Sequence, residues 1–498
     1  MSTQQAPPMI PHPSATTAGS IPTLCCFTNC QLCLAGELIA QDLYFSPETG
    51  CITPNYYYRT EGVERIDLGG AVVAPGFLDL QINGAAGVHF TELGLRRGRM
   101  AGDRVGELLA TIARREVEAG VTGWWATVPT VERGRWSEIL ALLAPRAFAN
   151  GASLLGAHAE GPYLHPSKKG AHNSSYFLDF DPSSSSSSNS NSPESIYNLP
   201  STTPTLKLVT LAPELPGSLQ LISHLQAQHP SITISLGHST AAYQTGLSAL
   251  HAGARALTHV FNAMPPLHQR EPGLAGLMGQ AAPHRPYYSV IADGVHLHPS
   301  VLRMALRTDP ARCMLITDSV ELAGLPDGIY PGNGQIRGRQ RKLGGRVTLV
   351  GEQQQQQQQQ QVENEAGEAQ AQAEEETLIG SCCSVEQCVR NMVAMADCTL
   401  AEAVRCVTEN VAGLMAESKR GVLEAGRRAD LVVLDLHDDE DDDAAAGGGS
   451  RFTVRETWVA GRRVYNRRDR DRDGGESRKD LGEGVDEGER KREDVTGR

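Results

Sequence analysis

The chain has 498 residues, and its 45 Lys plus Arg against 58 Asp plus Glu give a formal net charge of −13. This length is several times that of one ordinary domain, so a peptide hormone or a small disulfide-stapled module is excluded. The acidic balance argues against general nucleic-acid binding, because such a surface repels phosphate groups. We therefore expect no nucleic-acid partner.

The first segment, residues 1–22, has no Lys or Arg, no continuous apolar block and many Pro, Ser and Thr. It lacks the charged start and the apolar centre of a secretory signal, so we interpret it as a disordered tail. No later segment reaches the roughly 18 uninterrupted apolar residues of a membrane span. Eleven cysteines, an odd number, fit reduced thiols better than a disulfide framework. We expect a cytoplasmic protein without a membrane partner.

Four cysteines cluster near the start of the ordered region, at Cys25, Cys26, Cys30 and Cys33. The gap between Cys30 and Cys33 is that of a zinc knuckle, but no second Cys or His pair follows at zinc-finger distance. The cluster therefore favours small apolar residues in strands over a structural metal site.

Residues 71–420 alternate short apolar segments with longer segments of helical spacing. The predicted strands are 71–73, 123–128, 154–158, 206–212, 233–236, 256–260, 288–292 and 314–317, and the predicted helices are 103–119, 216–228, 241–252, 299–308, 384–396 and 400–416. About eight such units are typical of an α/β chain folded as a (β/α)8 TIM-like barrel. Low-complexity insertions near 181–203 and 351–376 interrupt this barrel.

The two ends of the globular region have a different character. Residues 23–70 contain short β-type runs with Gly and Asn turns, and residues 421–466 contain two more, separated by an acidic and Gly-rich loop at 437–450. Neither end has enough strands to close a core, so we expect both to form one small β-sandwich domain. The acidic run lacks the spacing of a calcium loop and favours a solvated hairpin tip. Residues 467–498 are predicted to be a disordered charged tail.

Polar residues that can bind a metal lie where the predicted barrel strands end: His158, Glu160, His238, His259 and Asp318. A single histidine of this kind is more often a satisfied core residue than a ligand. Together, one carboxylate and two imidazoles from three strand ends offer three ligands and leave a position open, as in a catalytic zinc site. A divalent ion lowers the pKa of water from about 15.7 to about 7, which creates a nucleophile at neutral pH. Asp318 is expected opposite the ion as the acid and base.

A second group of side chains indicates an anionic substrate. Asn262, His268, Arg270 and His296 lie in loops just after strand ends. The guanidinium of Arg270 offers a planar fork of donors that suits phosphate or carboxylate. Taken alone, a surface salt bridge to Glu271 explains Arg270 better.

Eight motifs occur together and in one order along the chain: APGFLDLQING at 74–84, HAEGPY at 158–163, KKGAH at 168–172, GHS at 237–239, THVFNAM at 258–264, REPG at 270–273, IADGVH at 291–296 and TD at 317–318. In this set the chain resembles the N-acetylglucosamine-6-phosphate deacetylases, a family of the metal-dependent amidohydrolase superfamily. The resemblance runs from about residue 68 to residue 435. It implies release of acetate from N-acetylglucosamine 6-phosphate in amino-sugar catabolism.

The resemblance also implies a role for individual residues. Glu160, His238 and His259 match the metal ligands of the family, Asp318 matches the acid and base, and His172 matches the residue that polarises the acetamide carbonyl. Substrate contacts match Ala171, Asn262, Ala263, Arg270, His296, Leu378, Ile379 and Gly380. Because the family's equivalent of Arg270 reaches the phosphate in a neighbouring subunit, the resemblance implies a homodimer.

Gln81 and Asn83 occupy the positions where many amidohydrolases carry a His pair that helps to hold a second metal. Amides are neutral, weak ligands, so we expect one divalent ion per subunit. Zinc is favoured by the ligand types, and iron, cobalt and manganese stay open. Two alternatives remain for function: another amidohydrolase specificity, or a non-catalytic sugar-phosphate-binding protein.

Overall fold

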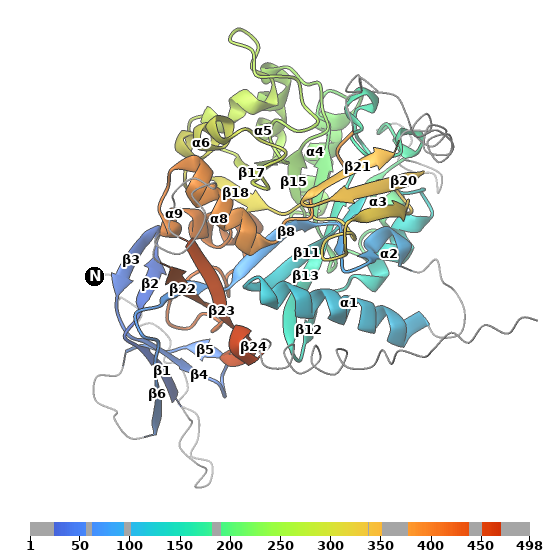
Figure 1. Ribbon diagram of the computed structural model, residues 1–498. Coiled ribbons are helices and arrows are strands. Elements are labelled where there is room, and N and C mark those ends of the chain that lie inside the picture. Colours follow the sequence, from blue (N-terminus) through green and yellow to red (C-terminus); the bar gives the residue numbers. More distant parts are fainter. Residues whose placement is uncertain are drawn as a thin grey trace, which may run out of the picture.

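A computed structural model describes residues 24–55, 62–93, 101–181, 191–336, 338–350, 377–437 and 451–469, without the side chains of 101–103 and 451. Its centre is a ring of parallel strands (Figure 1). In spatial and chain order these are β8 (Phe77–Ile82), β11 (Val121–Pro129), β13 (Gly151–Glu160), β14 (Leu206–Leu211), β15 (Thr233–Leu236), β16 (Ala256–Leu257), β17 (Tyr287–Ile291) and β18 (Cys313–Ile316). A parallel bridge between Ile82 and Ser319 brings the first and last strands together. The expected (β/α)8 barrel is confirmed.

The first barrel strand differs from the prediction. The predicted strand 71–73 lies in β7 (Val72–Pro75), which pairs with strands of the terminal β domain and not with the barrel. The barrel begins at β8 instead, after Gly76. A side chain at Gly76 would lie 2.2 Å from the Thr122 hydroxyl, so glycine permits the close passage between the two domains. The expected boundary at residue 71 therefore lies a few residues too early.

Helices follow most of the barrel strands and cover the outside of the ring (Figure 1). They are α1 (Ala101–Glu118), α2 (Arg135–Leu142), α3 (Pro193–Tyr197), α4 (Ser218–Gln228), α5 (Tyr243–Ala252), α6 (Pro299–Thr308), α8 (Val385–Ala396), α9 (Leu400–Arg405) and α10 (Glu409–Met415). The predicted helix 400–416 is thus two helices, broken at residues 406–408. Buried Leu109, Ile112 and Val117 show why α1 forms: its apolar face packs on the strands. Short elements β9 (Gly84–Ala85), β10 (Val88–His89), β12 (Arg146–Phe148), η1 (Phe90–Glu92), η2 (Pro166–Lys168), η3 (Ser174–Tyr176) and η5 (Leu274–Gly279) complete the barrel loops.

The two chain ends form a sandwich at one side of the barrel (Figure 1). One sheet has the order β5 (Cys51–Ile52), β4 (Leu43–Ser46), β1 (Leu24–Thr28), β6 (Val63–Asp67), and the other has β24 (Arg462–Asn466), β23 (Arg451–Val459), β22 (Leu431–His437), β7, β2 (Gln31–Leu34), β3 (Glu37–Ala40). Phe27, Phe45 and Trp458 meet edge to face in its core, with ring centroids 4.9–5.5 Å apart. This arrangement confirms the expected β domain built from both ends.

The clustered cysteines belong to the strands of this sandwich and the turn between them. Cys25, Cys30 and Cys33 are buried in or beside β1 and β2, with free thiols. Burial raises the pKa of Cys25 to about 11 and that of Cys33 to about 12, so these thiols stay protonated at neutral pH. They act here as small apolar core residues.

The expected insertion at 181–203 is only partly an insertion. Residues 182–190 lie outside the described residues, but α3 follows directly and packs into the core. Tyr197 is fully buried, contacts Trp136, and donates a hydrogen bond to the carbonyl oxygen of Gly161, 2.7 Å away. The charged tail also begins later than predicted, because Arg467 donates to the carbonyl oxygen of Val454. The insertion 351–376, the loop 438–450 and both outer tails lie outside the described residues.

A small antiparallel sheet that was not predicted lies beside the barrel mouth. Its strands are β19 (Gly328–Pro331), β20 (Arg339–Leu343) and β21 (Arg346–Val350). Residues 377–379 pair with β21 through backbone hydrogen bonds, including one from Ile379 to Val347 of 3.0 Å. The chain therefore leaves for the 351–376 insertion from this sheet and returns to it.

Glu116 on α1 is a buried carboxyl whose ionisation should destabilise the fold. Burial, and then the charge of Asp79, raise the pKa of Glu116 from 4.5 to about 8. Between these two values folding takes up a proton, so the free energy of unfolding falls as the pH rises. We expect Glu116→Gln to raise the melting temperature at pH 8 and to raise it much less at pH 5. Thermal melts of this variant and of the exposed control Glu107→Gln check the prediction, and equal shifts at both pH values would contradict it.

Within the described ranges, no helix combines the length and the apolarity that crossing a membrane requires.

Candidate active site

A cavity of about 260 Å³ opens at the C-terminal ends of the barrel strands. Of the residues to which the family resemblance assigns a role, all but Arg270 line it: Glu160, Ala171, His172, His238, His259, Asn262, Ala263, His296, Asp318, Leu378, Ile379 and Gly380. Residues 377–380 come from the segment paired with β21, so the small sheet forms part of the wall. The structure thus brings together residues that are up to 220 positions apart in the chain, from Glu160 to Gly380.

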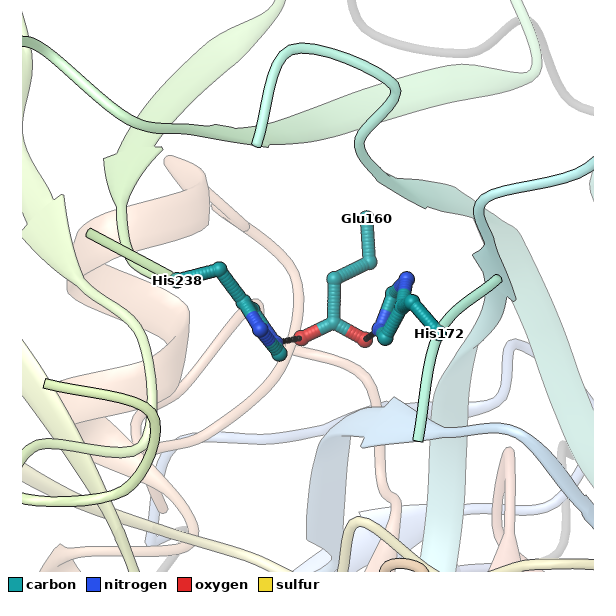
Figure 2. A group of neighbouring side chains, drawn as sticks. All are labelled: Glu160, His172 and His238. Carbon is teal, nitrogen blue, oxygen red and sulfur yellow. Dashed lines mark hydrogen bonds and ion pairs between the residues drawn. The ribbon is translucent and has the colours of Figure 1, made fainter. Parts of the chain in front are cut away.

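Glu160, at the end of β13, is the centre of the cluster. Figure 2 shows its carboxylate between two imidazoles, with one oxygen directed at each. Its Oε1 lies 3.2 Å from His238 Nε2 and 3.0 Å from His259 Nε2, and its Oε2 lies 3.5 Å from His172 Nε2. Burial alone would raise the pKa of Glu160, but the contacts with the three imidazoles hold it well below its usual range. The residue is therefore an anion at neutral pH.

The tautomer of His238 follows from its hydrogen bonds. Its Nδ1 lies 2.8 Å from the carbonyl oxygen of Lys168, which can only accept, so Nδ1 carries the proton. The Nε2 lone pair consequently faces the cavity, 3.2 Å from Nε2 of His259. A carbonyl that orients a histidine in this way is typical of the surroundings of metal ligands.

His172 has the opposite tautomer. Its Nδ1 accepts a hydrogen bond from the backbone N–H of Thr130, 3.2 Å away, so the proton sits on Nε2. Burial lowers the pKa of His172 to about 4, which keeps the ring neutral. His172 therefore presents an N–H donor to the cavity.

The backbone at the strand ends is unusual where the site residues lie. His238, His259 and Asp318 have φ values of 48°, 30° and 46°, in the left-handed region. Non-glycine residues in this region are held there by their surroundings and cluster at functional sites. Gly161, which follows Glu160, also has a positive φ, and a Cβ there would lie 2.1 Å from the Thr130 hydroxyl. These turns direct each side chain across the barrel mouth.

Asp318 follows β18 and is held by two amides from the end of β8. Its Oδ1 accepts hydrogen bonds from Gln81 Nε2 at 3.1 Å and from Asn83 Nδ2 at 2.8 Å. Gln81 Nε2 also lies 3.1 Å from Glu160 Oε1, so the Gln81 amide links the Asp318 carboxylate to the cluster around Glu160. Burial, and then the charge of Glu160, raise the pKa of Asp318 to about 6. The sequence analysis identified Gln81 and Asn83 as replacements for a metal-binding His pair, and it did not predict that they anchor Asp318.

The donor set fits a divalent metal ion. Glu160, His172 and His238 each offer a ligand atom, and these atoms lie within 4.8 Å of one another. Glu160 Oε1, His238 Nε2 and His259 Nε2 form a tighter triangle with sides of 3.0–3.2 Å. Two ligands of a tetrahedral zinc ion, each about 2.0–2.1 Å from the metal, lie about 3.3 Å apart. The second triangle therefore has nearly the ligand spacing of such a site.

His158 is a satisfied core residue and does not line the cavity. Its ring nitrogens lie 3.2 Å from the hydroxyl of Thr127 and 2.8 Å from that of Thr210, inside the barrel. Of the strand-end candidates it is the one whose ring nitrogens are both taken up by neighbouring hydroxyls.

Two residues expected to bind an anion, Asn262 and His296, line the same cavity. Asp293 Oδ2 lies 2.8 Å from His296 Nδ1, and this contact together with backbone hydrogen bonds lowers the pKa of Asp293 although burial acts against it. The Asp293 carboxylate thereby fixes the orientation of the His296 ring. Arg270 and His268 lie outside the cavity on the exposed loop after Asn262.

Residues 72–464 match the amidohydrolase family, so the chain belongs to this family. It is 34% identical over 416 residues to "N-acetylglucosamine-6-phosphate deacetylase" of Mus musculus, over 82% of this chain and 91% of that protein. Among these hydrolases, it belongs to the N-acetylglucosamine-6-phosphate deacetylase family, as its motifs predicted. A 30% match over 393 residues joins it to "N-acetylgalactosamine-6-phosphate deacetylase" of Escherichia coli O157:H7, over 78% of this chain and 87% of that protein.

Comparison with solved structures agrees with this family membership. A crystal structure of N-acetyl-D-glucosamine-6-phosphate deacetylase from Mycobacterium smegmatis superposes with a TM-score of 0.66 at 26% identity, over 89% of this chain and 100% of that chain. The barrel, the sandwich and the cavity therefore lie in a fold that a protein of that name shares.

Proposed function

We propose that this protein hydrolyses N-acetyl-D-glucosamine 6-phosphate to D-glucosamine 6-phosphate and acetate, in amino-sugar catabolism. The observation that carries the proposal is the placement of Asp318 in one cavity with Glu160, His238 and His259. The family membership adds the reaction class, and the hydrogen-bonding groups of His296 and Asn262 in the same cavity add an anion-binding end. We further propose a cytoplasmic location, in keeping with the free thiols of the described cysteines.

For the metal we propose one zinc ion, with Glu160, His238 and His259 as its ligands. When bound there, a divalent ion supplies Lewis-acid polarisation of the acetamide and lowers the pKa of water. The hydrogen bond from His238 Nδ1 to the Lys168 carbonyl oxygen leaves Nε2 as the nitrogen available to a metal, and the anionic carboxylate of Glu160 is the form that binds one. His172, whose Nε2 carries a proton, is assigned a different role.

The protein groups divide the proton transfers and the charge stabilisation. Asp318, with a pKa of about 6, is ionised at neutral pH and accepts a proton from the attacking water. It then delivers this proton to the nitrogen of the departing amine, so that one water is consumed and acetate leaves. The Nε2–H of His172 donates to the acetamide oxygen as negative charge develops on it. Asn262 and His296 bind the phosphate and orient the sugar.

Acetate release tests the proposal directly. Purified protein is incubated with N-acetylglucosamine 6-phosphate, with unphosphorylated N-acetylglucosamine and with N-acetylgalactosamine 6-phosphate. We expect N-acetylglucosamine 6-phosphate to be the best substrate. The kcat/KM for the unphosphorylated sugar should be only a small fraction of that value. The relative that is named for the galacto sugar makes the third substrate the specific competitor. Equal rates with and without phosphate would favour another amidohydrolase specificity.

We also propose a homodimer in which Arg270 binds the phosphate in the partner's cavity, because Arg270 is exposed and outside its own cavity. Arg270→Ala is expected to raise KM for the phosphorylated substrate. The Arg270→Ala and Asp318→Asn chains are unfolded together and the mixture is refolded, so that hybrid dimers form. Activity should be restored, since one site of each hybrid dimer has both Arg270 and Asp318. Random pairing restores about a quarter of the sites. Activity equal to the average of the two parents would place Arg270 outside the partner's site.

A further inference from the structure

Gln335 lines the active-site cavity but belongs to none of the sequence motifs. It lies on the loop between β19 and β20, and its exposed fraction is 8%. No hydrogen bond joins its side-chain amide to any other part of the chain that the structure describes. The amide thus reaches the cavity without a protein partner, so a ligand or water in the cavity can pair with it.

The loop that carries Gln335 is held rigidly. Asn333 Oδ1 accepts hydrogen bonds from the backbone N–H of Gln335 at 2.9 Å and of Ile336 at 3.0 Å. Asn333 Nδ2 in turn donates to Glu321 Oε1 at 2.8 Å, and Gln340 Nε2 donates to the same oxygen at 2.8 Å. Glu321 is buried three positions after Asp318. The loop is therefore fixed to the strand end that carries the proposed acid and base.

The surroundings of Gln335 indicate which part of a ligand it meets. Its neighbour Ile336 packs with Val320 and Ile379, and the last two also line the cavity. This wall has no charge, whereas the groups that suit phosphate come from the loops after β16 and β17. A neutral amide with both donor and acceptor atoms in an apolar wall matches a hydroxyl group better than a phosphate.

We propose that the Gln335 side chain binds a ring hydroxyl of the amino sugar and is a specificity-determining residue of this site. The inference rests on the proposed function. The contact lies away from the scissile amide, so it contributes orientation and discrimination between sugars. A site that holds a buried amide for a hydroxyl disfavours a sugar that leaves this amide unpaired.

The experiment compares Gln335→Leu with the unmodified protein on three substrates: N-acetylglucosamine 6-phosphate and its 3-deoxy and 4-deoxy analogues. Leucine keeps the apolar packing and removes the hydrogen bond. We expect kcat/KM for the parent substrate to fall about tenfold. For the analogue that lacks the partner hydroxyl, the variant and the unmodified protein should differ little, because the interaction is already absent.

Gln340→Leu is the matched control, since Gln340 supports the same loop and does not line the cavity. A structural disturbance of the loop should lower kcat/KM for all three substrates alike. The inference is overturned if Gln335→Leu behaves in that way, or if it leaves kcat/KM for the parent substrate unchanged. If the unmodified protein releases no acetate, the proposed function fails, which is a separate result. Melting curves confirm that each variant is folded.

Discussion

Asp318→Asn is expected to lower kcat for acetate release by about 10³-fold, with little change in KM. Asp318 Oδ1 accepts hydrogen bonds from Gln81 and Asn83, and an amide oxygen can accept the same two bonds. The substitution therefore keeps the geometry but replaces the second carboxylate oxygen by an NH₂ group, which accepts no proton. Steady-state kinetics with N-acetylglucosamine 6-phosphate measure the loss.

A control separates this effect from a change in the metal site. We expect the metal content of Asp318→Asn to equal that of the unmodified protein, because Asp318 is not among the proposed ligands. Asp309→Asn is the matched control: Asp309 pairs with Arg285 away from the cavity, and its replacement should leave kcat unchanged. Unchanged kcat in folded Asp318→Asn protein would remove Asp318 from the reaction.

The site was more predictable from the sequence than parts of the fold were. Glu160, His238, His259 and Asp318 each follow a short apolar segment, and parallel strands in a barrel bring their C-terminal ends together whatever the loop lengths. Low-complexity segments therefore did not obscure the site. Placing these residues required only the strand order, which the chain order supplies.

Three features of the structure were not predicted from the sequence, each for a physical reason. Residues 71–82 form one mostly apolar run with Asp79 and Gln81 as its polar residues, and its pattern does not reveal that β7 and β8 belong to different domains. The sheet β19–β21 is formed by short strands, with polar residues such as Arg341 and Lys342 in β20, next to a polyglutamine segment. Gln335 stands in a turn without a motif, so only its burial in the cavity distinguishes it.

Glu160→Gln is expected to reduce bound divalent metal in the purified protein from about one ion per chain to a small fraction, and activity by at least about 100-fold. A neutral amide is a weak ligand, and Glu160 is the one anion among three imidazoles. Elemental analysis measures the metal and identifies it as zinc, iron, cobalt or manganese. His224→Gln, which alters a surface imidazole paired with Glu194, should leave the metal content unchanged.

Elemental analysis also distinguishes His259 from His172 as the third metal ligand. His259 Nε2 lies 3.0 Å from Glu160 Oε1 and 3.2 Å from His238 Nε2, whereas His172 carries its proton on Nε2 and lies 3.5 Å from Glu160. We therefore expect His259→Asn to lose the metal and the activity together. His172→Asn should keep the metal and lose about 10²-fold in kcat, because it removes a donor to the developing oxyanion. Loss of metal from His172→Asn with retention in His259→Asn would exchange the two roles, since a ligand and a hydrogen-bond donor require opposite tautomers at the same atom.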